Sequence, residues 1–124
     1  MIELEEQAPM QAYQRYIHDL EELHGWLEVD LVHNCFLMGE EVGELFKAVR
    51  RIEKMFEQAE APDLDMQARK TDVGDEIVDV MNYLMAIANR LDIDLETAFR
   101  RKNAANQART WGEQQAEPSD ATGD

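Results

Sequence analysis

The sequence predicts an all-α protein, and its composition and the spacing of its apolar residues are the two observations that predict it. Only three of its 124 residues are proline and six are glycine. Alanine, leucine, glutamate, methionine and arginine, which favour helix, are common in the chain. Apolar residues recur at three- and four-residue steps, which is the spacing of amphipathic helices. We therefore expect one domain of four main helices, long enough to carry a core.

The first helix is expected from about Met10 to near His24 and Gly25, after a loose acidic lead-in at residues 1–9. Its apolar positions follow i, i+3, i+4 spacing: Tyr13, Tyr16, Ile17, Leu20 and Leu23. Gly25 suits a C-terminal cap, because glycine readily adopts the left-handed conformation that ends many helices. Asp30 is suited to capping the next helix through its side-chain carboxylate.

The second and third helices each carry an apolar stripe that is predicted to be buried. The second runs from about Leu31 to Gln58, with Met38, Val42, Leu45, Val49, Ile52 and Phe56 on its stripe. The third begins near Thr71 or Asp72 and carries Val73, Ile77, Val80, Leu84, Ile87 and Leu91. The residues between them, around Pro62, predict a loop with room for one further helical turn.

The fourth helix is expected from Leu95 to about Arg109, with Asp94 as its N-cap. It concentrates basic residues although the protein as a whole is acidic: Arg100, Arg101, Lys102 and Arg109. Residues 112–124 contain four acids, no lysine or arginine, and small polar side chains, so they predict a disordered tail. The expected domain therefore spans residues 10–111.

The net charge of −15 argues against a nucleic-acid polymer or an anionic membrane as the main partner. No apolar run is long enough for a membrane span, and the N-terminus has no export signal. The single cysteine, Cys35, excludes an intramolecular disulfide, which favours a cytoplasmic location.

Two pairs of acidic residues border the apolar stripes of the second and third helices. Glu41 and Glu44 form one pair at i, i+3, and Glu76 and Asp79 form the other. If the two helices pack face to face, four carboxylates converge, as in carboxylate bundles that hold metals. Without a cation they would repel one another, and their oxygen ligands suit Mg²⁺ or Mn²⁺. The alternative is a solvated acidic surface, because 27 acids in one chain produce such pairs by chance.

The two acidic motifs, Glu41-Val-Gly-Glu44 and Glu76-Ile-Val-Asp79, resemble the Glu-x-x-Glu…Glu-x-x-Asp signature of the MazG-like nucleoside triphosphate pyrophosphohydrolases. The residues after Asp79, the turn from Leu91 to Glu96, and Lys102, Asn106, Arg109 and Trp111 extend the resemblance. It covers roughly residues 10–111. It implies a helical bundle that is completed by oligomerisation, and hydrolysis of a (deoxy)nucleoside triphosphate to the monophosphate and pyrophosphate.

The resemblance also implies roles for individual residues. Glu41, Glu44, Glu76 and Asp79 would hold Mg²⁺, with Mn²⁺ as a substitute, and Glu41 would orient or deprotonate the attacking water. Substrate-binding residues would be Lys102, Asn106, Arg109, Tyr83 and Trp26. The alternatives are a solvent-facing helix for the first three of these, a core position for Tyr83 and a packing role for Trp26.

The predicted function is therefore nucleotide-pool house-cleaning by a Mg²⁺-dependent hydrolase. A homodimer or homotetramer is expected, because Phe36, Phe46 and Met55 lie off the main stripe of their helix. One alternative is a pyrophosphohydrolase for another nucleotide, such as phosphoribosyl-ATP. The other is a non-catalytic acidic helical module that binds a partner.

Overall fold

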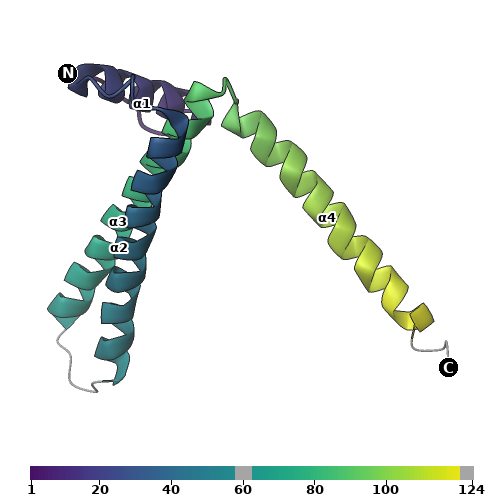
Figure 1. Ribbon diagram of the computed structural model, residues 1–124. Coiled ribbons are helices and arrows are strands. Elements are labelled where there is room, and N and C mark those ends of the chain that lie inside the picture. The colour runs from purple at the N-terminus through teal and green to yellow at the C-terminus, as the bar shows by residue number, and fades with distance from the viewer. Residues whose placement is uncertain (58–62, 121–124) are drawn as a thin grey trace.

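The computed structural model describes the backbone of residues 1–57 and 63–120, and the side chains of residues 1–53 and 65–109. It confirms the all-α fold class: over the described residues there are four helices and no strand. They are α1 (Met10–His24), α2 (Leu31–Glu57), α3 (Asp63–Arg90) and α4 (Leu95–Asp120) (Figure 1). None of the described helices has the length and apolar character needed to cross a lipid bilayer.

Helices α2 and α3 form an antiparallel pair, and α1 crosses the end of this pair where α2 begins and α3 ends (Figure 1). Helix α1 packs on α3 and also touches the start of α4. From there α4 runs away from α2 and α3, so that the molecule is open between them (Figure 1). One chain therefore forms a pair of helices, α2 and α3, with α1 across one end and α4 projecting away from them.

The three predicted helix caps are confirmed. The left-handed φ of 73° at Gly25 ends α1, and the Gly25 N–H donates to the Glu22 carbonyl at 3.2 Å. Asp30 accepts the His33 N–H at 2.7 Å at the start of α2. Asp94 accepts both the backbone N–H and the hydroxyl of Thr97, at 3.1 and 2.6 Å, at the start of α4. These contacts satisfy groups that have no partner within the helices.

The third helix begins earlier than predicted. It starts at Asp63 rather than at Thr71 or Asp72, and the Thr71 hydroxyl donates to the Gln67 carbonyl at 3.1 Å. Thr71 therefore lies inside the helix and bonds to the preceding turn, as threonines within helices do. The residues after Pro62 contain no glycine or proline before Gly74, so nothing local breaks the helix.

The fourth helix extends past the predicted end near Arg109 and reaches Asp120. Residues 112–120, which were predicted to belong to a disordered tail, thus have helical backbone, and residues 121–124 lie outside the described part of the chain. Glutamine, alanine and glutamate, which favour helix, make up residues 113–117. The division of the chain into lead-in, domain and tail stays a prediction.

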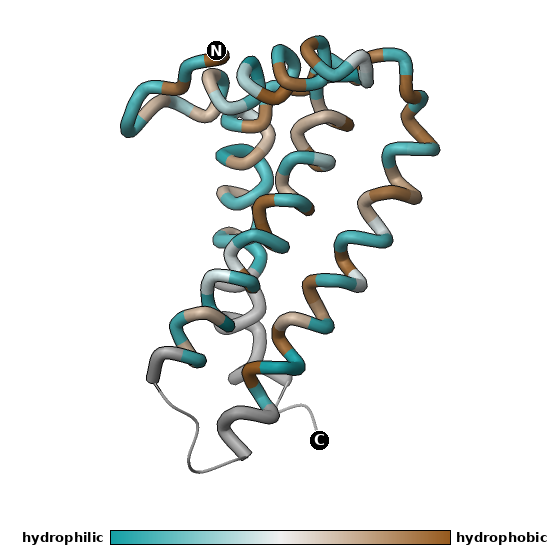
Figure 2. Tube along the Cα trace, turned by 90° about the vertical axis from the view of Figure 1, so that its left-hand side faces the viewer, coloured by the Kyte–Doolittle hydropathy of each residue, from teal (hydrophilic) through white to brown (hydrophobic). Residues whose placement is uncertain are grey.

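The hydrophobic core is small, and its cluster of Ile17, Met85 and Ala86 lies where α1 crosses the helical pair. Among the described residues, the buried hydrophobic ones are Ile17, Ala48, Met85, Ala86 and Ala88. The prediction of fully buried stripes is wrong for this single chain, because several stripe residues are exposed: Val49, Ile77, Leu84 and Leu91. Figure 2 shows brown, apolar segments recurring along the helices, and α1 covers only one end of the pair. Met55, Phe56 and Trp111 lie outside the residues whose side chains are described.

Candidate functional site

Three carboxylates meet between α2 and α3. Glu41 extends from α2, whereas Glu76 and Asp79 extend from α3, one helical turn apart. One carboxylate oxygen from each residue lies within 4.8 Å of those of the other two. Glu44 is exposed and lies outside this group, although its charge acts on Glu41. We call Glu41, Glu76 and Asp79 the acidic cluster.

The acidic cluster carries charge that no described cation offsets. Partial burial raises the pKa of Glu41, and the negative charges of Asp79 and Glu76 raise that pKa further. Its hydrogen bond with Glu76 and the charge of Glu44 act in the same direction. The Oε2 atom of Glu76 is buried and has no hydrogen-bond partner among the described residues. A buried carboxylate oxygen without a partner is costly, so a ligand that donates to it or carries positive charge would stabilise the site.

A hard divalent cation fits these residues. The donors are carboxylate oxygens alone, which suit Mg²⁺ or Mn²⁺ better than a metal that prefers sulfur or nitrogen. The unpartnered Oε2 atom of Glu76 could coordinate such a cation. The positive charge would also offset the repulsion from Asp79 and Glu76, which adds to burial in raising the pKa of Glu41. The acidic cluster could therefore hold a metal ion.

A pocket of about 480 Å³ opens beside the acidic cluster and is large enough for a small organic ligand. It is enclosed by α1, the connector of residues 25–30, α2 and α3. Its lining includes two members of the cluster, Glu41 and Asp79, and two aromatic residues, Trp26 and Tyr83. Other lining residues are Ile17, Leu20, Glu21, His24, Val29, Asn34, Leu37, Asn82 and Ala86.

The two aromatic residues present different groups to this pocket. Trp26 is half exposed, and its ring stacks on that of His24 with centroids 4.4 Å apart. Tyr83 is partly buried, and burial, followed by the charges of Glu41 and Asp79, raises the pKa of its hydroxyl. Tyr83 is therefore a neutral hydrogen-bond donor at neutral pH, and Trp26 offers a flat apolar surface.

An arginine that the sequence analysis missed holds the pocket wall in place. Arg90, at the end of α3, forms a two-point ion pair with Glu21 of α1, with distances of 2.7 and 3.0 Å. It also donates to the carbonyls of Val29 at 2.8 Å and Trp26 at 2.9 Å. The connector between α1 and α2 is thus fixed to α3. The signal in the sequence is Glu21, a charged residue four positions after Ile17 on the apolar stripe of its helix.

A second polar contact fixes the other side of α1. The amide of Gln14 donates to the Ile93 carbonyl at 2.9 Å and to Asn89 at 3.1 Å, and accepts the Leu95 N–H at 3.0 Å. Asn89 donates in return to the Gln14 carbonyl at 2.8 Å. The turn between α3 and α4 is therefore fixed to α1.

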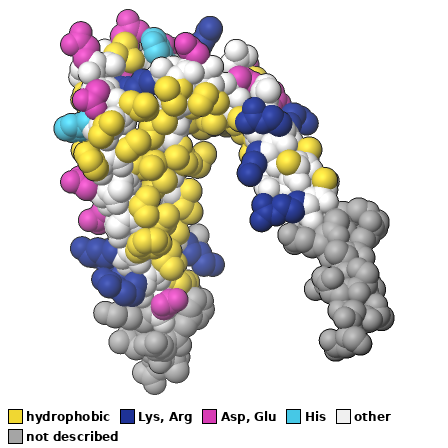
Figure 3. Space-filling view, turned by 45° about the vertical axis from the view of Figure 1, so that its right-hand side comes forward, with side chains coloured by type: hydrophobic (Ala, Val, Ile, Leu, Met, Phe, Trp, Pro, Cys, Tyr) yellow, Lys and Arg dark blue, Asp and Glu magenta, His cyan; other side chains and the backbone are white. Residues whose placement is uncertain are grey.

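Three residues that were expected to bind substrate do not reach this pocket in the single chain. Lys102, Asn106 and Arg109 are exposed on α4, the helix that projects away from α2 and α3 (Figure 1). They are absent from the pocket lining, and Asn106 donates to Asn103 at 3.3 Å on its own helix. Figure 3 shows the basic side chains of α4 separated from the apolar face of the helical pair by open space.

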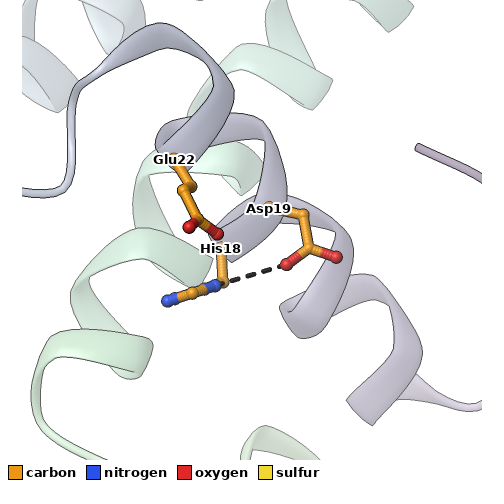
Figure 4. Close-up of side chains that lie close together, drawn as sticks. All are labelled: His18, Asp19 and Glu22. Atoms are coloured by element: carbon orange, nitrogen blue, oxygen red, sulfur yellow. Dashed lines mark hydrogen bonds and ion pairs between the residues drawn. The ribbon is translucent and has the colours of Figure 1, made fainter. Parts of the chain in front are cut away.

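A further group with metal-ligand chemistry lies on α1. His18, Asp19 and Glu22 present ligand atoms within 4.8 Å of one another, and His18 contacts Asp19 at 3.4 Å (Figure 4). All three come from about one turn of a single helix, two of them are exposed, and none lines the pocket. We assign this group no role.

Comparison with known proteins supports the fold. No family model matches the chain, and no curated protein sequence matches it significantly. Among solved structures, the crystal structure of a pyrophosphatase from Archaeoglobus fulgidus DSM 4304 is similar, with a TM-score of 0.61 and 21% sequence identity. The likeness covers 86% of this chain and 97% of that one. At this identity, the comparison shows that the two proteins share the fold.

Proposed function

We propose that this protein is a Mg²⁺-dependent nucleotide pyrophosphohydrolase of the MazG-like type. Its substrate would be a (deoxy)nucleoside triphosphate, cleaved between the α- and β-phosphates to the monophosphate and pyrophosphate. The observation that carries the proposal is the acidic cluster, which lies beside a pocket lined by Trp26 and Tyr83. A cation held by these carboxylates would attract phosphates, and the aromatic side chains suit a flat base. The shared fold with a pyrophosphatase supports the same class of reaction.

The residues of the site would have different roles in binding and hydrolysis. Glu41, Glu76 and Asp79 would hold the cation, with Glu44 one turn further along α2 as an additional ligand. When bound, Mg²⁺ supplies positive charge to the phosphate oxygens and lowers the pKa of bound water. Glu41, which also lines the pocket, would in addition orient the attacking water or take its proton. Tyr83 and Trp26 would contact the nucleoside.

We also propose that the protein works as a homodimer or homotetramer. Large hydrophobic residues are exposed along α2, α3 and α4: Val32, Phe36, Phe46, Val49, Ile77, Val78, Met81, Leu84 and Phe99. Figure 3 shows an apolar face that runs along the helical pair. Monomeric proteins rarely expose an apolar surface this extensive. Helix α4 of a second copy suits this face, because it carries exposed Phe99 together with basic residues that complement the acidic cluster. In that arrangement Lys102, Asn106 and Arg109 of the second copy would bind phosphate.

Hydrolysis of a substrate panel tests the activity. The protein would be incubated with Mg²⁺ and each standard or deoxy triphosphate, phosphoribosyl-ATP or inorganic pyrophosphate, and the products identified. We expect equal amounts of monophosphate and pyrophosphate, and no turnover after chelation of the metal. Orthophosphate from inorganic pyrophosphate alone would contradict a nucleotide substrate. Turnover of phosphoribosyl-ATP alone would identify the alternative nucleotide, and no turnover at all would favour the non-catalytic module.

A mixing experiment tests the assembly. Chains with Glu41→Gln and chains with Lys102→Ala would be co-expressed and purified together, each being inactive alone. If α4 acts across the interface, a mixed dimer has one site with intact carboxylates and an intact α4, and activity returns. If each chain completes its own site, both sites of the mixed dimer are defective, and no activity returns. A monomeric mass by light scattering would also contradict the assembly.

A further inference from the structure

Asn34, on α2, is the most buried polar side chain among the described residues, and it lines the pocket beside the acidic cluster. Only 3% of its surface is exposed. Its polar atoms are therefore placed by the fold, and those that face the pocket are available to a ligand.

The orientation of the Asn34 amide is fixed by its neighbours. Its Nδ2 atom donates to the carbonyls of Val29 at 3.1 Å and Asp30 at 2.9 Å, which uses both of its hydrogens. The reverse orientation would place Oδ1 against two carbonyl oxygens. The same Val29 carbonyl accepts a bond from Arg90, so the acceptor is itself held in position. Oδ1 is thus the atom left for the pocket, and no described residue donates to it.

An amide oxygen in this position can only accept a hydrogen bond. A ligand group with an N–H satisfies it, whereas a ligand carbonyl oxygen would face it without a bond and lose its own hydration. Sites that must hydrogen-bond a ligand group discriminate strongly against analogues that cannot supply it. Asn34 therefore distinguishes an amino group from a keto oxygen.

The distance from Asn34 to the acidic cluster suits a nucleotide. Asn34 precedes Glu41 by two helical turns, about 10 Å along the helix axis. This span is comparable to the separation between the phosphate of a nucleotide and the far edge of its base. Trp26 and Tyr83, which line the same pocket, provide aromatic surface for the ring.

We propose that Asn34 selects nucleotides whose base carries an exocyclic amino group on its Watson–Crick edge, so that cytosine is preferred to uracil and adenine to hypoxanthine. This inference rests on the proposed function, because it places a nucleotide in the pocket with its phosphates at the acidic cluster.

Matched nucleotide pairs test the inference in two independent measurements. The first compares kcat/KM for CTP against UTP, and for ATP against ITP, by pyrophosphate release with Mg²⁺. The second compares the binding of CMP against UMP, and of AMP against IMP, by calorimetry, so that it needs no turnover. We expect the amino member of at least one pair to be favoured by about tenfold or more in both measurements.

The Asn34→Ala variant should bring this ratio close to one, because it removes the oxygen that accepts the amino group. The variant should fold, because the Val29 carbonyl keeps its bond from Arg90 and the Asp30 carbonyl keeps the Asn34 backbone N–H at 3.0 Å. His33→Ala is the matched control, since His33 is an exposed neighbour that does not line the pocket, and it should keep the wild-type ratio.

Each result decides the inference. A ratio near one in the wild type, or an unchanged ratio in Asn34→Ala, would overturn the role of Asn34 while leaving the proposed activity intact. Failure of every nucleotide to turn over would refute the proposed function, and the binding ratios would still report on Asn34. Failure of every monophosphate to bind would overturn the inference as well.

Discussion

Between the helices, the described residues form a paired group of charges and an unpaired one. At the end covered by α1, Glu21 meets Arg90 in a two-point ion pair whose side chains are 9% and 15% exposed. Between α2 and α3, the acidic cluster brings three carboxylates together, and one buried oxygen has no partner among the described residues.

The comparison separates a structural role from a binding role. The ion pair of Glu21 and Arg90 is complete within one chain, and it fixes the connector that walls the pocket. The acidic cluster is not balanced by charge within the described residues, and burial together with the charges of Asp79 and Glu76 raises the pKa of Glu41. A fold keeps such a cluster at a cost in stability, which is typical of sites that bind a cation or act on a substrate.

The largest effect is expected from removing a charge of the acidic cluster. Glu41→Gln, Glu76→Gln and Asp79→Asn should each reduce Mg²⁺-dependent pyrophosphate release by at least about 100-fold, since they remove proposed ligands directly. Glu40→Gln is the matched control, because Glu40 is exposed beside Glu41 and lies outside the cluster. Equal losses for Glu40→Gln and Glu41→Gln would show that the cluster has no special role.

A large loss of stability is expected from breaking the paired group. Arg90→Ala should lower the free energy of unfolding by about 3–5 kcal/mol, because it leaves Glu21 buried without its partner. Arg100→Ala removes an exposed i, i+4 ion pair with Glu96 and should lower the free energy of unfolding by only about 0.5 kcal/mol. Urea denaturation of both variants measures the difference. Similar values for the two would mean that the Arg90 contacts do not hold the fold together.

The smallest effect is the change in melting temperature caused by Glu41→Gln. Its sign at neutral pH should differ between the metal-free protein and the protein with Mg²⁺. The raised pKa of Glu41 means that the metal-free folded protein holds a proton that the unfolded chain releases near the ordinary value of 4.5. Stability should therefore fall as the pH rises from this value through the raised pKa. Glu41→Gln removes this loss, so the metal-free variant should melt at a higher temperature than the wild type at neutral pH.

Adding Mg²⁺ should reverse the order of the two melting temperatures. The cation would stabilise the wild-type cluster by binding the folded state, and it should stabilise Glu41→Gln less. Thermal melts in chelator and in Mg²⁺ provide both comparisons. A metal-free wild type that gains more stability than Glu41→Gln as the pH rises from about 4.5 would contradict the assigned sign.

The helices and the meeting of the carboxylates follow from local sequence patterns. Asp30 and Asp94 cap their helices as predicted, because capping depends on residues a few positions apart. The spacing of Glu76 and Asp79 places both on one helix face, and antiparallel packing brings Glu41 opposite them. Glu44 lies outside the acidic cluster. Whether it joins the other carboxylates depends on how α2 and α3 cross, which residue spacing does not determine.

The paired group and the course of α4 could not be predicted in this way. Glu21 and Arg90 are 69 positions apart, and a charged residue in an amphipathic pattern is ordinarily interpreted as solvent-facing. Their pairing depends on the angle at which α1 crosses the other helices. Helix α4 contains its expected residues, but its direction follows from the short turn fixed by Gln14 and Asn89, which no periodic pattern encodes.

The small core has a consequence for how folding depends on concentration. Three of the five hydrophobic residues that are buried in the described part of the chain are alanines, so this part of the interior excludes little apolar surface from water. Self-association that covers the apolar face would supply much of the free energy that stabilises the folded state. Folding and assembly would then be a single equilibrium. Dilution alone should lower the melting temperature, which makes protein concentration a variable that every stability comparison of these variants must hold constant.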